Sequence, residues 1–208
     1  MIQSSPPPLK IGTRGSPLAL AQAVETRARL MRAWDWPDKA FEVVAIQTSG
    51  DRIQDRPLRL VGGKGLFTRE IEDQLLDGQI DIAVHSMKDM PTAQPEGLIL
   101  DTFLPREDMR DAFVSQSANS IGSLTEGARV GTSSLRRRAQ LMLVRPDLDV
   151  VEFRGNVQTR LKKLTDGLAS ATFLAMAGLN RLNMAHVATV AIEPEQMLPA
   201  LAQGVIGI

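Results

Sequence analysis

Residues 79–91, QIDIAVHSMKDMP, combine the pattern of a buried strand with a charged end. Ile80, Ile82 and Val84 form a short apolar run directly after Gly78, which predicts a buried strand. The run ends in the polar sequence HSMKD, and the following proline cannot donate to a sheet. In an open α/β sheet, ligands bind just outside the carboxyl ends of the strands. Asp89, beside a lysine, is therefore a candidate catalytic carboxylate, with a solvated turn as the alternative.

The composition is that of an ordinary globular protein with one or two domains. The chain has 208 residues, of which 43% are hydrophobic and 23% charged. Twenty-four basic residues balance 24 acidic ones, so no overall field attracts nucleic acid. Aromatic residues make up only 4%, too few for an evident base-stacking platform. Nucleic-acid binding by residues 136–163 is the disfavoured alternative, and it predicts steeply salt-dependent affinity.

Several kinds of site and segment are excluded by residue type. There is no cysteine, hence no disulfide or thiolate, and two histidines cannot make a histidine-rich metal site. No apolar run approaches the roughly 18 residues of a membrane span. The N-terminus lacks the basic and apolar regions of a secretory signal. We therefore expect a soluble, cytoplasmic protein with neither a metal nor a membrane partner.

The first part of the chain predicts strands at residues 9–13 and 41–48. Ser16 and Pro17 open a helix as N-cap and first residue, and an apolar face is expected on Leu20, Val24, Ala28 and Met31. Residues 66–77 form a second helix, with Phe67, Ile71 and Leu75 on one face and Gly78 at its C′ position. Between them, residues 49–65 show no period and predict a lid or a disordered segment.

The second part predicts another α/β unit after a turn-rich crossing at residues 105–110. Strands are expected at residues 111–115, 129–132, 149–153, 171–177 and 187–192. One helix should bury Leu135, Ala139 and Met142, and another should bury Val157, Leu161 and Leu164. The apolar residues 204–208 begin one more strand, and because the chain stops within it we expect a longer natural protein.

Basic residues stand at four predicted junctions between a strand and a helix: Arg14, Arg136 with Arg137, Arg154, and Arg181. Cations at a helix N-terminus oppose the helix dipole and so lower the stability of the helix. The sequence shows no structural compensation for this loss, which indicates a function. Such junctions gather at one edge of a parallel sheet, so the arginines are expected to bind a ligand with several carboxylates. Scattered surface arginines are the alternative. A single acid among these cations, Asp89, should stay ionised and stabilise a developing cation or hold a substrate N–H.

An ordered set of motifs resembles the porphobilinogen deaminase (hydroxymethylbilane synthase) family over about residues 9–208. The motifs are IGTRGSPLALAQA, VGGKGLFTREIE, DIAVHSMKDMPT, REDMRDAFVS, VGTSSLRRRAQL, FRGNVQTRLKKL, MAGLNRL and LPALAQGVIGI. The resemblance implies an α/β fold of two lobes like those of type II periplasmic binding proteins, each a mixed, mostly parallel sheet flanked by helices. Domain 1 would comprise residues 1–105 and 198–208, and domain 2 residues 106–197.

The resemblance also implies a transferase of tetrapyrrole biosynthesis, monomeric, with a dipyrromethane cofactor. It condenses four porphobilinogen molecules into hydroxymethylbilane and releases ammonia at each step. Asp89 would be the catalytic carboxylate, binding pyrrole N–H groups and stabilising the azafulvene cation, while residues 49–65 would form a loop over the site and Phe67 an aromatic wall. Substrate carboxylates would be bound by Arg14, Ser16, Arg154, Arg160 and Arg181. Cofactor-binding residues would be Lys64, Ser86, Lys88, Thr132, Ser133, Ser134, Arg136, Arg137, Gly155, Asn156, Arg160, Gln203 and Gly204.

The sequence departs from the family in one serious respect. Family members attach the cofactor through a cysteine in a third, C-terminal domain, whereas this chain has no cysteine and ends before that domain. We therefore predict that these residues alone turn over little or no porphobilinogen. Two smaller departures are Leu60, where some relatives have lysine, and Ala202, where glycine is common. The alternative function is a two-lobed, non-catalytic receptor for a small polycarboxylate, which would gain nothing from Asp89.

Overall fold

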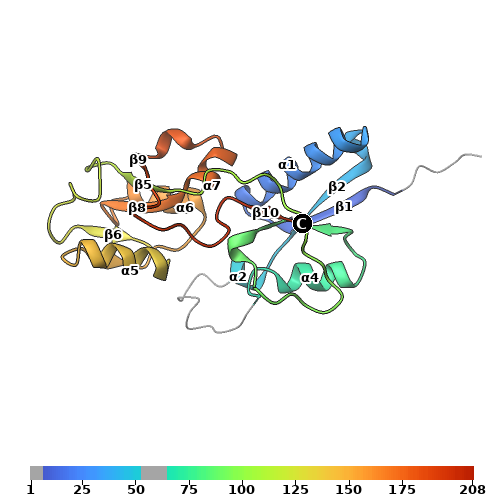
Figure 1. Ribbon diagram of the computed structural model, residues 1–208, viewed down its shortest axis with the longest axis horizontal. Helices are drawn as coiled ribbons and strands as arrows, with labels where there is room; N and C mark the ends of the chain where they lie inside the picture. Colours follow the sequence, from blue (N-terminus) through green and yellow to red (C-terminus); the bar gives the residue numbers. More distant parts are fainter. Residues whose placement is uncertain (1–6, 53–64) are drawn as a thin grey trace, which may run out of the picture. The chain divides into compact units, whose positions relative to one another are not determined.

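The computed structural model describes residues 7–52 and 65–208 (Figure 1). These residues form two compact units. Residues 7–52, 65–105 and 205–208 make the first unit, and Arg106–Gly204 make the second. Within the described ranges, the chain passes into the second unit at Arg106 and returns to the first for its last four residues. The assignment of catalysis to one domain and carboxylate binding to the other stays a prediction.

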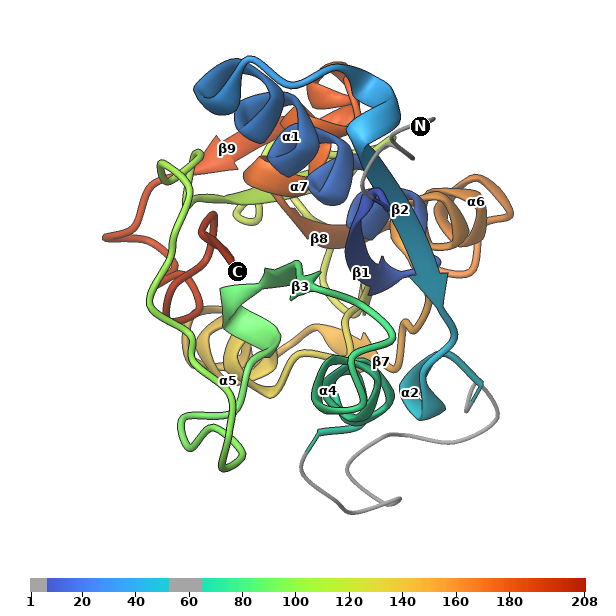
Figure 2. The ribbon, with the colours of Figure 1, turned by 90° about the vertical axis from the view of Figure 1, so that its right-hand side faces the viewer.

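The first unit is built on a three-stranded parallel sheet in the order β2-β1-β3 (Figure 2). β1 (Leu9–Arg14) pairs with β2 (Phe41–Ile46) along its whole length, and β3 (Ile82–Ala83) lies on its other side. Helix α1 (Pro17–Trp34) connects β1 to β2, and α4 (Arg69–Leu76) precedes β3. Parallel neighbours need such crossover helices, so the βαβ pattern predicted from the sequence is confirmed.

The strand predicted within residues 79–91 is shorter than expected. Ile80 and Val84 are both 2% exposed, as the apolar run predicts, but only Ile82–Ala83 pair with β1. The chain then forms β4 (His85–Ser86), which pairs antiparallel with β10 (Ile206–Gly207). The returning end of the chain therefore takes over the hydrogen bonds that a longer β3 would have made.

Helix α1 begins as predicted but buries a different face. The Ser16 hydroxyl accepts from the Ala19 amide at 3.3 Å, and Pro17 is the first helical residue. The buried residues include Ala19 and Ala23, whereas Val24 is 46% exposed. The expected face through Val24 and Ala28 is therefore wrong. Small residues on the inner face let the helix lie close to the sheet.

The segment after β2 is not structureless throughout. Residues Ser49–Arg52 form a short helix, α2, so the prediction of no secondary structure is wrong for them. The remainder of the predicted loop, residues 53–64 with Lys64, lies outside the described residues. Helix α4 ends at Leu76 with Asp77 as its C-cap, and Gly78 has a φ of 68°, as its predicted C′ position requires.

The second unit contains a five-stranded mixed sheet in the order β7-β6-β8-β5-β9. Its strands are β5 (Asp111–Ser115), β6 (Arg129–Gly131), β7 (Asp149–Val151), β8 (Ala171–Ala175) and β9 (Val190–Ile192). β6 is parallel to β7 and β8, and β5 is antiparallel to β8 and β9. The helices are α5 (Leu135–Val144), α6 (Val157–Thr165) and α7 (Met176–Arg181), and the short 3₁₀ helices of the chain are η1 (Asp38–Ala40), η2 (Met87–Asp89) and η3 (Ala185–Val187).

Two apolar clusters cover the two faces of this sheet. Phe113 and Phe173 belong to one, with ring centroids 6.0 Å apart, and Leu174 and Leu179 belong to the other. Successive residues of a strand point to opposite faces, which explains why Phe173 and Leu174 belong to different clusters. The predicted mixed α/β fold is confirmed in both units.

The inner face of α5 differs from the predicted apolar face. Leu135 is 66% exposed and Ala139 is exposed, while Arg137 is 5% and Leu141 0% exposed. An arginine therefore lies on the buried face, in place of the predicted Leu135 and Ala139. None of the helices in the described part of the chain is long and apolar enough to cross a membrane.

Candidate functional site

In the second unit, three adjacent parallel strands end at one edge of the sheet. β6 is followed by residues 132–134 and the start of α5, β7 by residues 154–156, and β8 by α7. This edge brings together most of the predicted residues of the unit. Arg181 is an exception, because β8 ends at Ala175 and Arg181 is the last residue of α7. Its predicted place at a strand-to-helix junction is wrong.

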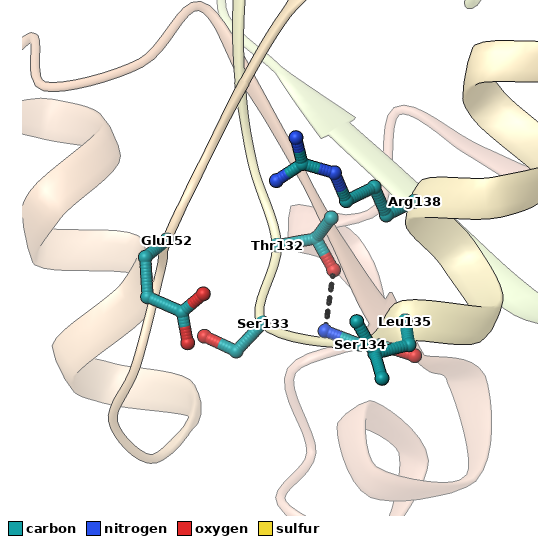
Figure 3. Close-up of a pocket in the computed structure, with 6 residues that line it drawn as sticks. All are labelled: Thr132, Ser133, Ser134, Leu135, Arg138 and Glu152. Carbon is teal, nitrogen blue, oxygen red and sulfur yellow. Dashed lines mark hydrogen bonds between the residues drawn. The ribbon is translucent and has the colours of Figure 1, made fainter. Parts of the chain in front are cut away.

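A cavity of about 460 Å³ opens beside the first of these junctions (Figure 3). Its lining residues are Thr132, Ser133, Ser134, Leu135, Arg138 and Glu152. The Thr132 hydroxyl accepts from the Ser134 amide at 3.2 Å, and the Ser134 hydroxyl accepts from the Arg137 amide at 3.4 Å. Ser133 accepts from the Phe153 amide at 3.1 Å. The three hydroxyls thus shape the turn and cap α5, and they line the cavity at the same time.

Three residues of this cavity were not predicted as site residues: Leu135, Arg138 and Glu152. In Figure 3 the Glu152 carboxylate and the Ser133 hydroxyl point toward one another from two neighbouring chain segments. Arg138 donates from Nη1 to the Val150 carbonyl at 3.3 Å. The run of three arginines was the available signal. Successive helical residues point about 100° apart, so the run alone could not show which arginine faces which side.

Asp111 is the centre of a buried ionic cluster behind the same edge. It lies on β5 with 0% exposure, and its Oδ1 accepts from Arg137 Nη2 at 2.7 Å and from Gln203 Nε2 at 2.9 Å. Arg136 Nη2 lies 2.7 Å from Oδ2, an ion pair whose angle is not that of an aligned hydrogen bond. Arg137 also donates to the Phe173 carbonyl at 2.8 Å. The cations at the start of α5 therefore have a structural role as counterions of Asp111, contrary to the prediction.

The charges in this cluster do not balance. Burial would raise the pKa of Asp111, but the Arg137 guanidinium, the hydrogen bonds from Arg137 and Gln203, and Arg136 together lower it below its ordinary value. One carboxylate thus faces two guanidinium groups. Arg136 is the more accessible of the two, with 24% of its side chain exposed against 6% for Arg137. Its Nε is buried without a partner among the described residues, and its Nη1 donates to the Leu198 carbonyl, so an anion would reach Arg136 through the exposed part of its side chain.

The loop after β7 holds the predicted residues 154–156. The Asn156 side chain accepts from the Thr159 amide at 2.8 Å and so caps α6. Arg160 donates from Nε to the Gly155 carbonyl at 2.8 Å, and Lys163 donates to the Arg154 carbonyl at 3.0 Å. Two cations of α6 therefore lie against this loop.

Gln203 and Gly204 belong to the segment that leaves the second unit. Gln203 is 1% exposed and also donates to the Met109 carbonyl at 2.8 Å, while Arg181 Nη2 donates to the Gly204 carbonyl at 3.1 Å. Gly204 has a φ of 92°, and a Cβ there would lie 2.4 Å from the Glu107 carbonyl oxygen. Both residues hold the backbone of this segment in place.

In the first unit, Asp89 lies exposed on η2, and it forms no salt bridge with any other described residue. Lys88 beside it is also exposed, and Ser86 accepts from Gln22 Nε2 at 2.8 Å. Burial, and more weakly Arg14, lower the pKa of His85 to about 4. His85 is therefore uncharged near neutral pH, and Asp89 is the acidic group that this turn presents to solvent, beside Lys88.

Arg14 is the last residue of β1, paired with Ile46, and its side chain contacts two other segments. Its guanidinium pairs with Asp51, and it lies 4.1 Å from the centroid of the Phe67 ring. The Ser16 hydroxyl accepts from the Ala19 amide and so caps α1. Phe67 is thus placed beside a predicted substrate-binding arginine of the same unit.

Solved structures of similar fold are two-lobed binding proteins. The substrate-binding domain of a putative molybdenum ABC transporter from Clostridium difficile gives a TM-score of 0.52 at 12% identity, covering 96% of this chain and 82% of its own. The periplasmic VFT2 domain of Bordetella pertussis BvgS gives 0.50 at 13%, covering 97% and 80%. These likenesses confirm the predicted fold class, that of type II periplasmic binding proteins.

Comparison of sequences identifies the family. The family model "Porphobilinogen deaminase, dipyromethane cofactor binding domain" matches residues 9–208. Porphobilinogen deaminase of Paracoccus denitrificans is 69% identical over 97% of this chain, and the chloroplastic enzyme of Oryza sativa is 59% identical over 96%. This chain spans 64% and 56% of the lengths of those two relatives. Because the match to the family model includes every described element from β1 to β10, the chain belongs to the porphobilinogen deaminase family.

Proposed function

We propose that this chain is the part of a hydroxymethylbilane synthase that binds porphobilinogen and dipyrromethane and carries the catalytic carboxylate. The reaction joins four porphobilinogen molecules into hydroxymethylbilane and releases ammonia in tetrapyrrole biosynthesis. Support comes from the family match and from the 69% identical relative, which is named as a porphobilinogen deaminase.

The observation that carries the proposal is the surplus positive charge of the Asp111 cluster. Two guanidinium groups share one buried carboxylate, and Arg136 is the more exposed of the two, with 24% of its side chain exposed against 6% for Arg137. Porphobilinogen carries acetate and propionate arms, and a guanidinium can bind such carboxylates through two parallel hydrogen bonds. A carboxylate arm on Arg136 would restore the balance of charge.

The donors on this edge fit a dipyrromethane, which has acidic arms of the same kind. Arg136 would hold one arm through the exposed part of its guanidinium, and the hydroxyls of residues 132–134 line a cavity at the same junction. When bound, the group supplies the primer onto which the first porphobilinogen is added. The resemblance implies attachment through a cysteine, and these 208 residues contain none, so non-covalent binding is what we propose for them. Lys64, Lys88, Gly155, Asn156, Gln203 and Gly204 are proposed to contribute, as the family motifs imply, whereas the buried Arg137 is assigned to the Asp111 ion pair.

Asp89 is proposed to act on the reacting pyrrole. It is exposed and has no salt bridge within the described residues, so it can accept a hydrogen bond from a pyrrole N–H. A fixed carboxylate also stabilises positive charge that develops on a ring during loss of ammonia. Arg14, Arg154, Arg160 and Arg181 are proposed to bind the acidic arms of the substrate.

The test uses the holoenzyme with porphobilinogen and follows the absorbance of oxidised tetrapyrrole. Intact mass reports dipyrromethane loading, and Arg136→Gln is compared with Arg129→Gln, an exposed arginine on the same sheet paired with Asp149. We expect turnover by the parent, and lost loading for Arg136→Gln alone. No turnover by a loaded parent, or equal loading in both variants, would contradict the proposal. A cytoplasmic location and a monomeric state are further proposals from the sequence.

A further inference from the structure

Arg14 is held on two sides within the first unit. Asp51 accepts from Arg14 Nε at 3.3 Å and from Nη2 at a shorter distance, which makes a side-on, bidentate ion pair. The face of the guanidinium lies 4.1 Å from the centroid of the Phe67 ring. Among the described residues, Arg14 Nη1 has no hydrogen-bond partner.

Asp51 is itself fixed from the opposite side. Its Oδ2 accepts from the Thr48 hydroxyl at 2.8 Å and from the Thr48 amide at 3.3 Å. Burial would raise the pKa of Asp51, but the hydrogen bonds from Arg14 and Thr48 and the charge of Arg14 lower it. Asp51 is therefore ionised at neutral pH and is oriented by Thr48, two residues after the end of β2.

A second carboxylate anchors the same short helix without touching Arg14. Glu70 Oε1 accepts from the Ser49 amide at 2.8 Å, from the Ser49 hydroxyl, and from Arg52 Nη2 at 3.1 Å. The Gly50 amide donates to the Leu66 carbonyl at 2.7 Å. A Cβ on Gly50 would lie 2.3 Å from the Phe67 ring, so α2 packs directly on the ring that covers Arg14. Glu70 thus offers a matched control, because it fixes α2 but makes no contact with the guanidinium.

We propose that Asp51 is a positioning residue that orients Arg14 for a substrate carboxylate. A guanidinium has two edges that can each bind a carboxylate in a bidentate manner. Asp51 occupies the edge formed by Nε and Nη2, and Phe67 covers one face. The edge formed by Nη1 and Nη2 is then the one presented to the substrate. Because the Arg14–Asp51 pair is neutral, it contributes a fixed geometry rather than a net attraction. This inference rests on the function proposed above, in which Arg14 binds substrate.

The first test measures the Arg14–Asp51 contact and needs no activity assay. Nitrogen-15 NMR of this chain follows exchange of the Arg14 Nε–H with water, with Arg14→Lys providing the assignment. We expect slow exchange in the parent and in Glu70→Gln, and at least tenfold faster exchange in Asp51→Asn. Equal exchange in the parent and Asp51→Asn would overturn the positioning role.

The second test is a double-mutant cycle on holoenzyme turnover of porphobilinogen. Asp51→Asn is expected to raise KM five- to twentyfold with kcat within twofold, and Glu70→Gln to change KM less than twofold. In the Arg14→Lys background, Asp51→Asn should change KM less than twofold, because it acts through Arg14. An equal effect in both backgrounds, or the same rise in KM for Glu70→Gln, refutes the inference. A parent holoenzyme without turnover refutes the proposed function, and the NMR arm then still decides whether Asp51 fixes Arg14.

Discussion

The buried carboxylate of Asp111 should dominate the stability of the second unit, and Asp111→Asn removes its charge at nearly constant volume. The substitution leaves Arg137, which is 5% exposed, without a counterion inside the sheet–helix interface. An Asn amide can still accept one hydrogen bond at the Oδ1 position. At the other position its NH₂ group would face the donors of Arg136.

The expected loss follows from the burial of the partners. Removing one member of a buried ion pair costs about 3–5 kcal/mol, because the other charge stays desolvated. Arg137 is subject to the full penalty, and Arg136, whose side chain is 24% exposed, regains part of its hydration. We therefore expect about 3–5 kcal/mol for Asp111→Asn. The matched control is Asp149→Asn, whose pair with Arg129 is 51% and 57% exposed and is worth less than about 1 kcal/mol.

Hydrogen exchange read by mass spectrometry measures this loss locally. Peptides that cover β5 and α5 should exchange at least a hundredfold faster in Asp111→Asn, since about 1.4 kcal/mol corresponds to a factor of ten. Both tryptophans, Trp34 and Trp36, lie in the first unit, so their fluorescence during urea unfolding reports that unit separately. A loss below 1 kcal/mol in β5 and α5, or equal effects of the two variants, would refute the assigned role of Asp111.

Four further variants or conditions test other parts of the structure. Gly204→Ala should lower the free energy of unfolding by more than about 2 kcal/mol, through a left-handed φ and the Glu107 carbonyl 2.4 Å from the new Cβ; an unchanged urea midpoint would contradict this. Ala202→Gly should raise the free energy of unfolding by up to about 1 kcal/mol, because Ala202 has a φ of 54°, and a lower urea midpoint would argue against that strain. Asn156→Ala should cost about 1 kcal/mol and speed exchange in the first turn of α6, which an intact exchange pattern would disprove. Because the pKa of Asp111 is lowered in the folded state, its contribution is complete above the ordinary carboxyl pKa of about 4 and is lost as the pH falls further; chemical unfolding below pH 4 should therefore be less pH-dependent in Asp111→Asn than in the parent.

Local features were predictable from the sequence because their causes are local. The cap at Ser16, the first helical proline and the C′ glycine at residue 78 each depend on a few neighbouring residues, and the structure has all three. The end of β3 was not predictable in the same way. It depends on pairing with β10, about 120 residues further along the chain.

The buried faces of α1 and α5 show a second limit of sequence patterns. Apolar spacing placed Leu135 and Ala139 inward, yet α5 buries Arg137 because Asp111 supplies a counterion 26 residues away. Nothing in a helical period shows such a partner. Because the distant counterion cannot be seen in the sequence, Arg136 and Arg137 were given one role, although only Arg136 is placed to offer its charge to a ligand. The acid that contacts Arg14, Asp51, lay in a segment predicted to lack structure.

The central claim is that Asp89 acts in the chemistry and is not merely an exposed acid on a turn. The most direct test compares porphobilinogen turnover of the holoenzyme carrying Asp89→Asn with that of Asp73→Asn, an exposed acid on α4 of the same unit. We expect Asp89→Asn to lower kcat at least a hundredfold with unchanged dipyrromethane loading, and Asp73→Asn to match the parent. A kcat for Asp89→Asn within threefold of the parent would contradict the account.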